Sequence, residues 1–467
     1  MDKDSGAMTV FFSLLLISFL LILNVCVEGI YAWKAKGAFA LQQEMTGEYA
    51  LACYHKELWE QFHLLAIDGR YYKKMESSLK TNWTRNGNPP LTKLLVKRGD
   101  ALTNTEVLKH EIREYMKYKE TTDILKRLSN ALKGVEDESN SKKYGEAIGK
   151  VKSQEDKDVK EAMKQSTKEY EQVKDPREGL SKLLSGNLLK LVLPSDHSLS
   201  KKSISIVYGT KGKETFHGIN FFSPKSVEET MKENKKSKAS TNISTEGLSV
   251  AYAREVFSTA IDPQRDAGIR YEMEYLIGGK NRDDQNLEVV VKKLLLIRFC
   301  LNYGYLIKDA GKNAQAEAMA AAIAGPASAV PGVVSGIRLL LLAAWSYGEA
   351  ILDVKGLLAG KKIALSKNNA TWSLSLKNLG KLSGTAKTVK NGIGYKEYLE
   401  LLLLLQTNKE EKYKRMMDMI SLRIQEKQKD FTLTDSLFSF TLQFEEKVSA
   451  LLMGNGYDFS AVRIFSY

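Results

Sequence analysis

The chain has little cysteine and little histidine. Among its 467 residues there are three cysteines, Cys26, Cys53 and Cys300, and five histidines. No CxxC pair occurs, and three scattered cysteines cannot build a disulfide framework or a thiolate metal site. His55 and His63 are eight residues apart, without a third ligand at a suitable spacing. The sequence therefore predicts no bound metal and no cofactor.

Motifs of the common enzyme and nucleic-acid-binding classes are also missing. The glycine-containing stretches at residues 212–214 and 278–281 lack the spacing of a phosphate-binding loop. Neither the GxSxG nucleophile elbow nor the HExxH zinc motif occurs. The basic residues are dispersed without a recognition motif, which disfavours nucleic acid as a partner. These absences favour a protein that is not an enzyme and has no catalytic residue.

Proline is absent from the start of the chain, where the longest apolar run lies. No proline precedes Pro89, and residues 7–27 carry no formal charge. At about 1.5 Å of rise per residue, this run is long enough to cross the ~30 Å hydrocarbon core of a bilayer. The helical pattern continues to Trp59. We therefore expect one helix that leaves the membrane and continues into a large soluble body.

The features around this run favour an uncleaved anchor over a secretory signal. A signal has a basic start and an apolar stretch of roughly 7–15 residues, whereas here one lysine stands between two aspartates before a longer run. Orientation is less clear from the residues. Lys34 and Lys36 follow the run and only Lys3 precedes it, which favours a cytoplasmic body. That bias is small, and long domains can translocate regardless of flanking charge.

The chain is basic, with a net charge of +13. A basic body is attracted to anionic surroundings such as lipid headgroups and cell-envelope polymers, but we favour the simpler interpretation of a lysine-rich solvated surface. The partner that the sequence predicts most directly is the lipid bilayer, through residues 7–27.

Composition divides the chain into three predicted parts. They are a membrane anchor at residues 1–30, a helical stalk and charged helical region at 31–193, and an α+β body at 194–467. Residues 133–178 are dominated by charged side chains and serine, which predicts solvated helix or disorder. The fold class is α+β and mainly helical, with a long N-terminal transmembrane helix and a small sheet.

Within the body, periodicity predicts individual elements. Alternating apolar residues indicate strands, and apolar residues at three- and four-residue steps indicate helices. The expected elements are strands at 203–208, 269–276 and 437–444, a helix from Gln285 through Tyr305, a buried helix within 314–359, a buried run at 401–405 in a helix continuing towards Met419, and a mobile loop at 226–246.

Two polar pairs stand out on the predicted helices. Arg298 and Asn302 are four residues apart, and so are Glu349 and Asp353, which follow Trp345 in an apolar stretch. Four-residue spacing places each pair on one helix face. The acidic pair is either a catalytic or metal site or one side of a structural ion pair with Arg298. We favour the ion pair, which requires Arg298 to lie within about 10 Å of a carboxylate.

The same segments carry a resemblance to a known family. It rests on an apolar N-terminal helix ending in Glu28 and on several short stretches. These are YHKELW at 54–59, YLIGGK at 275–280, LLIR at 295–298, AWSYGE at 344–349 and RMMD at 415–418. The chain resembles an uncharacterised family of membrane-anchored proteins from clostridia-like Gram-positive bacteria. Its members are encoded beside tight-adherence (Tad/Flp) pilus and secretion components, and their starts resemble TadE/TadG pseudopilins.

The resemblance implies an extracytoplasmic body and supplies no catalytic residues. One departure concerns processing, because prepilin cleavage needs a glutamate shortly after a glycine, whereas no glutamate follows Gly6 until Glu28. We therefore do not expect cleavage at Gly6. The preferred function is a non-enzymatic component of a Tad-like pilus or secretion apparatus, acting through other components or self-association. The alternatives are a membrane-tethered exported enzyme or cell-wall-binding module, and an inside-facing scaffold on anionic lipid.

Overall fold

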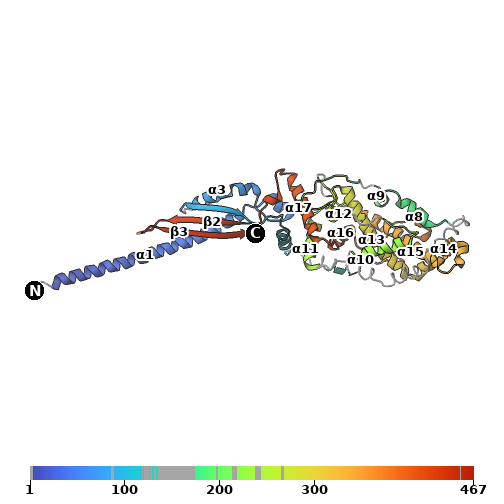
Figure 1. Ribbon diagram of the computed structural model, residues 1–467, viewed down its shortest axis with the longest axis horizontal. Coiled ribbons are helices and arrows are strands. Elements are labelled where there is room, and N and C mark those ends of the chain that lie inside the picture. The colour runs from blue at the N-terminus through green and yellow to red at the C-terminus, as the bar shows by residue number, and fades with distance from the viewer. Residues whose placement is uncertain are drawn as a thin grey trace. The chain divides into compact units, whose positions relative to one another are not determined.

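The apolar run forms the first half of one long helix in the computed structural model, α1 (Asp4–Leu51) (Figure 1). The structure describes residues 4–85, 89–117, 119, 126, 129–130, 133–134, 174–195, 198–212, 218–236, 243–263, 268–452 and 454–467. The large apolar side chains from Met8 to Val25 are all at least 50% exposed. Among the described residues, α1 provides the one helix that is long and apolar enough to cross a membrane. It fits a membrane anchor, as predicted.

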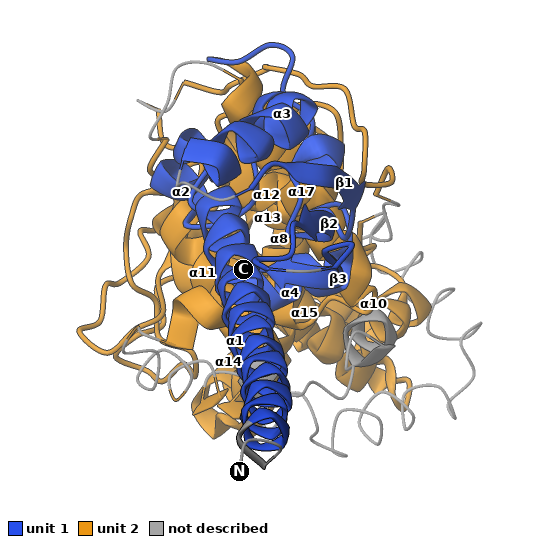
Figure 2. Ribbon diagram, turned by 90° about the vertical axis from the view of Figure 1, so that its left-hand side faces the viewer, with its two compact units in different colours: residues 1–111, 427–467 blue, residues 112–426 orange. Residues whose placement is uncertain are grey.

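The chain forms two compact units (Figure 2). The first consists of residues 1–111 and 427–467, and the second of residues 112–426. These limits differ from the sequence-based boundaries after residues 30 and 193. The reason is that strands from both ends of the chain pair with each other, which composition along the chain does not reveal.

The first unit is built on a three-stranded antiparallel sheet. Its order is β1 (Leu91–Arg98), β2 (Ser439–Val448) and β3 (Tyr457–Ser466). The pairing sets Leu94 opposite Phe444, across more than 300 residues of sequence. The second half of α1, together with α2 (Lys56–Phe62) and α3 (Gly69–Arg85), completes the unit.

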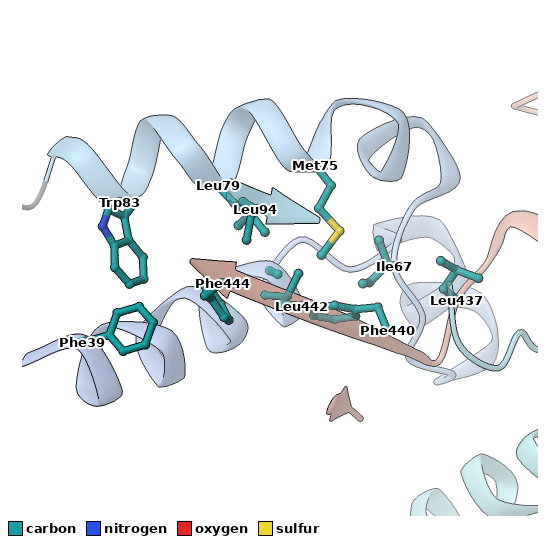
Figure 3. Close-up of a cluster of buried hydrophobic side chains, with 11 residues drawn as sticks. Phe39, Ile67, Met75, Leu79, Trp83, Leu94, Leu437, Phe440, Leu442 and Phe444 are labelled. Carbon is teal, nitrogen blue, oxygen red and sulfur yellow. The ribbon is translucent and has the colours of Figure 1, made fainter. Parts of the chain in front are cut away.

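The core of this unit joins α1, α3 and the sheet (Figure 3). Phe39 of α1 and Trp83 of α3 meet edge to face, with ring centroids 5.9 Å apart. Phe440, Leu442 and Phe444 are fully buried and alternate along β2 with less buried residues. This alternation confirms the strand predicted at residues 437–444.

One contact between α1 and the sheet has a measurable consequence. Gly47 lies directly against the ring of Phe465 on β3, so a Cβ at this position overlaps the ring. We expect Gly47→Ala to lower the free energy of unfolding by about 1–3 kcal/mol, as overpacking of a core does. Gly37→Ala is the matched control, because a Cβ there meets no atom within 4 Å. That change should stabilise the helix by up to about 1 kcal/mol. Urea unfolding in detergent tests both, and equal effects of the two changes contradict this packing.

The regular elements described in the second unit are helices, which are joined by loops and a few isolated bridges. Two long helices, α13 (Asp283–Lys308) and α15 (Val333–Leu358), pack together and are buried over most of their length. The other elements surround them or continue the chain. They are α8 (Pro176–Leu184), α9 (Leu188–Val192), α10 (Pro224–Lys236), α11 (Ile243–Val256), α12 (Glu272–Gly278), α14 (Ala310–Ala324), η1 (Gly325–Ala329), η2 (Leu376–Lys381), α16 (Tyr395–Leu404) and α17 (Lys409–Gln425). Residues of α4 (Thr105–Lys117) belong to both units. A further turn, η3 (Leu433–Asp435), belongs to the first unit.

Several element predictions are confirmed. The helix expected from Gln285 is α13, and the buried helix expected within residues 314–359 is α15, preceded by α14. Both helices continue over many residues because their apolar positions recur every three or four residues.

The strand predicted at residues 269–276 is wrong, because this segment contains α12. All seven residues of α12 are buried, including Glu272 and Glu274. The alternation of apolar and charged residues thus reflects two buried carboxylates with internal partners, not a strand with one solvated face.

The strand predicted at residues 203–208 is also wrong. Ser203 makes one isolated bridge, to Arg282. The backbone amides of Val207, Tyr208 and Gly209 donate to the carboxylate of Asp418 instead of to a neighbouring strand.

Three other boundaries differ from prediction. α1 ends at Leu51 and not at Trp59, which lies on α2. The helix predicted through residues 401–419 is two helices, since Asn408 caps the start of α17. The loop predicted at 226–246 includes most of α10 and the start of α11. The charged region at 133–178 lies mostly outside the described residues.

Candidate functional site

The polar pairs singled out from the sequence meet in the middle of the second unit. Arg298 on α13 and Asp353 on α15 form a salt bridge, with 2.8 Å between Nη2 and Oδ2. Lys367, in the segment that follows α15, places its Nζ 2.7 Å from Glu349 Oε1 and 2.7 Å from Asp353 Oδ1. Arg298, Glu349 and Asp353 have no exposed surface. The structure thus brings all three predicted residues together and adds a second cation.

Lys367 was missed because no local pattern marks it. It belongs to a loop segment with mixed composition, and its partners are 14 and 18 residues earlier in the chain. A lysine in such a segment reads as a surface residue, and only the packing of the loop on α15 buries it.

The cations of this cluster donate all their hydrogen bonds to other groups of the protein. Arg298 donates to Asp353, to Asn302 Oδ1, to the Tyr398 hydroxyl and to the carbonyls of residues 364 and 365. Lys367 also donates to the carbonyl of Thr371. Because these partners take up all five N–H groups of the guanidinium and all three of the ammonium, neither cation has a donor left for a ligand.

The two carboxylates of the cluster also have their hydrogen-bond partners within the protein. Glu349 accepts hydrogen bonds from the backbone N–H groups of Ser373 and Leu374, at 3.0 and 2.7 Å. Asp353 Oδ2 accepts from Arg298 and from the side-chain amide of Asn302, at 3.0 Å. Both carboxylates therefore hold the segment after α15 onto α13 and α15.

The electrostatics of the two acids differ. Burial by itself raises the pKa of Asp353, but the adjacent Arg298 and Lys367 cations outweigh burial and hold that pKa below its usual value. Burial and the neighbouring Asp353 raise the pKa of Glu349 above its usual value, against the pull of Lys367. Two cations facing two carboxylates make a neutral cluster when all four are charged, which is the condition under which buried ions are tolerated.

A second buried network joins two of the short stretches that carried the family resemblance. Asp418 on α17 accepts hydrogen bonds from the three amides at residues 207–209 and, at 2.7 Å, from the Tyr275 hydroxyl. Arg415 donates to the carbonyls of Leu276 and Ile277. The RMMD and YLIGGK stretches therefore form one packing unit. The sequence offered no signal for this, since 140 residues separate them.

A further buried acid, Glu274, lies on α12. Glu274 Oε1 accepts a hydrogen bond from the backbone N–H of Ala260, at 2.9 Å, and one from the Tyr395 hydroxyl, at 2.8 Å. The other oxygen, Oε2, has no hydrogen-bond partner among the residues that the structure describes. Burial raises the pKa of Glu274 to about 7, in spite of these two donors.

This raised pKa predicts a pH-dependent stability. The folded chain holds the Glu274 proton more tightly than the unfolded chain, so its contribution is complete below pH 4.5 and is lost as the pH rises towards about 7. The slope is up to about 1.4 kcal/mol per pH unit. We expect Glu274→Gln to remove this slope, which urea unfolding at about pH 5 and about pH 8 measures. Glu288→Gln on α13, where the side chain is 43% exposed, controls for the loss of one charge. If the free energy of unfolding changes equally with pH in the wild type and in Glu274→Gln, the raised pKa of Glu274 is contradicted.

A cavity of about 1350 Å³ lies elsewhere in the second unit. It is lined by residues of α8 and α9, by residues 218–220 and by the start of α13. Two of its cations are paired with acids that also line it, Arg282 with Asp284 and Lys292 with Glu288. Tyr347 of α15 lines the cavity, whereas Glu349 and Asp353 do not. The buried ion cluster and this cavity are therefore separate features.

The described residues contain no group of three or more histidine, cysteine, aspartate or glutamate side chains arranged to hold a metal ion. Neither Cys53 nor Cys300 is part of a disulfide. The clusters around Arg298 and Asp418 fix loops onto helices.

Comparison with known proteins gives one match. A model described as a family of unknown function (DUF5702) matches residues 166–448. The matched range contains the clusters around Arg298, Asp418 and Glu274, as well as β2. No curated protein and no solved structure matches the chain.

Proposed function

The chain belongs to this family of unknown function, and from that premise we propose that it is a non-enzymatic, membrane-anchored component of a Tad-like pilus or secretion apparatus. In this proposal its body lies on the extracytoplasmic side. α1 spans the bilayer once and acts as a pseudopilin-like stalk.

The observation that carries this proposal is the division of α1 into two halves. From Met8 to Val25 its large apolar side chains are exposed, whereas Phe39 and Ala50 are buried in the core with the sheet. One uninterrupted helix therefore serves both as a membrane span and as a structural part of the first unit. That arrangement supports the resemblance of the N-terminus to TadE/TadG pseudopilins.

The polar clusters support a role without catalysis. In a catalytic site, acids and bases face a space that a substrate can enter. The Arg298 cluster is fully buried and its donors are all engaged within the protein. Such groups contribute to folding and leave the chain to act through its surfaces.

The side of the membrane is tested by protease treatment of intact cells. We expect residues 31–467 to be digested from outside, while the membrane-embedded run is protected. Protection of the whole body until the cells are opened would place it in the cytoplasm and support the inside-facing scaffold instead.

Membership of an apparatus is tested by deleting the gene. We expect pilus or secretion assembly to be lost and to return when the wild-type chain is supplied. A chain with arginines at Leu15 and Leu20 should not restore it, because its anchor is disrupted. Unchanged assembly after deletion contradicts the proposal.

The cavity favours a second candidate, an exported module that binds a cell-envelope polymer. Its volume of about 1350 Å³ exceeds the ~300–1,000 Å³ typical of small-molecule sites, and it is lined by Lys190 and Lys201 as well as by the two ion pairs. Retention of the purified body on isolated cell walls, lost on replacing both lysines with glutamate, would support this candidate over the first.

A further inference from the structure

Glu28 marks the point where the apolar run of α1 ends, and it is held by the turn between β2 and β3. Its carboxylate accepts hydrogen bonds from the backbone N–H groups of Leu451 and Leu452, at 3.0 and 2.9 Å. It also accepts one from the Tyr457 hydroxyl, at 2.9 Å. The tip of the hairpin is thereby fixed beside one defined residue of α1.

The position of Glu28 along α1 sets the depth of this tip. Residues 7–27 rise about 31 Å along the helix, close to the ~30 Å thickness of the hydrocarbon core. If α1 spans the bilayer, Glu28 lies at the boundary between acyl chains and headgroups. The residues that bind it lie at the same level.

The side chains at the tip suit that boundary. Leu451 and Leu452 are 51% and 52% exposed, although their backbone is held on Glu28. About one turn further along α1, Trp33 is 80% exposed and is followed by Lys34. Tryptophan and lysine are typical of the headgroup layer, where an aromatic ring and a cation both find partners.

We propose that the β2–β3 turn is a second membrane-contacting element, which inserts Leu451 and Leu452 into the headgroup and upper acyl region of the bilayer that α1 spans. The proposal rests on the membrane anchor of the proposed function. The turn contacts lipid in this proposal because the Glu28 hydrogen bonds place Leu451 and Leu452 at the depth of the bilayer surface. A protein partner at this site is the outcome that the test must exclude.

The rest of the hairpin leads away from the membrane along α1. Tyr457 contacts Glu28, Arg463 donates to Gln43 and the hydroxyl of Tyr467 donates to the carbonyl of Leu51. Ile464 lies seven residues beyond Tyr457, a rise of about 23 Å along the strand. It is 77% exposed, so it provides an apolar control outside the bilayer.

The test uses single-cysteine chains that carry an environment-sensitive fluorophore, in phosphatidylcholine vesicles with brominated acyl chains. One chain is labelled at the native Cys26, with Cys53→Ser and Cys300→Ala. Two others add Cys26→Ser and carry Leu452→Cys or Ile464→Cys. An unfolding temperature equal to that of the wild type shows that a labelled chain is folded. If the Leu452→Cys chain is not folded, Leu451→Cys replaces it.

We expect the labels at Cys26 and at Leu452→Cys to lose most of their fluorescence, with the second quenched best by bromines near the headgroups. The label at Ile464→Cys should keep its fluorescence. Quenching at Cys26 alone overturns the inserted turn and leaves the anchor standing. If the Leu452→Cys label is not quenched in vesicles but this position is protected from water-soluble reagents in cells, the turn binds a protein partner. Absence of quenching at Cys26 overturns the anchor and the inserted turn together.

Discussion

Replacing Asp353 with alanine should lower the free energy of unfolding by about 3–5 kcal/mol, the loss that follows when one partner of a buried ion pair is removed. Arg298 has no exposed surface and would lose the acceptor of its Nε and one Nη2 bond. Lys367 would keep only Glu349 as an anionic partner. Two buried cations would then face one carboxylate. Urea unfolding of the purified chain, followed by the fluorescence of the tryptophans, measures the loss.

A surface pair provides the matched control. Glu76 and Lys80 on α3 form a salt bridge of 2.8 Å, with side chains 47% and 45% exposed. Glu76→Ala should change the free energy of unfolding by no more than about 0.5 kcal/mol, because water and salt screen an exposed pair. Equal losses for Asp353→Ala and Glu76→Ala contradict the assignment of the buried cluster.

A double replacement separates charge from packing in the same cluster. Arg298→Met with Asp353→Leu removes one charge of each sign and leaves Lys367 with Glu349. The double variant should be more stable than Asp353→Ala, since no buried cation lacks a partner. If it is less stable, the lost hydrogen bonds to Tyr398 and to the carbonyls of residues 364 and 365 outweigh the unpaired charge.

The second large effect concerns the anchor. Arginines at both Leu15 and Leu20, near the middle of the apolar run, should release the chain from the membrane. Each arginine at the centre of a membrane helix costs about 2.5–3.5 kcal/mol on insertion scales. We expect the wild-type chain to stay with the membranes during alkaline extraction and the double variant to appear in the soluble fraction.

Ala38 and Ala40 provide the control for this experiment. Both are exposed on α1 beyond Glu28, so arginines there should leave the chain in the membrane fraction. The intact mass of the membrane-bound chain adds an independent result, because it must include residues 1–27 if the run is an anchor. A mass that lacks them identifies a cleaved signal, and retention of the Leu15/Leu20 double variant shows that another part of the chain binds the membrane.

Elements with a clear period were predictable from the sequence. The apolar steps of α13 and the alternation on β2 follow from where one face of an element must be buried. The uncharged run of α1 was predictable from its length and composition. α12 was not predictable in the same way. Its two glutamates look solvated in sequence, and partners that include Arg423 and Tyr395, more than 100 residues later, make their burial possible.

The pairing of β1 and β3 with β2 was equally hidden. β1 lies more than 300 residues before its partner, and the outward residues of β3, including Val462 and Ile464, interrupt the expected alternation. Strand pairing across such distances depends on how the intervening second unit closes on itself. No pattern within either strand predicts this pairing.

By itself, the sequence determined that this chain carries a charge-free helix of membrane-spanning length, and that Arg298 and the two acids lie on faces able to meet. These properties depend on residues only a few positions apart. Tertiary structure alone decided that Lys367 completes the ion cluster, that Asp418 binds the loop at 207–209, and that the β2–β3 turn is held on Glu28. Each of these contacts joins segments that are separated in sequence, and a charge that loses water on folding is tolerated only where the fold supplies a partner.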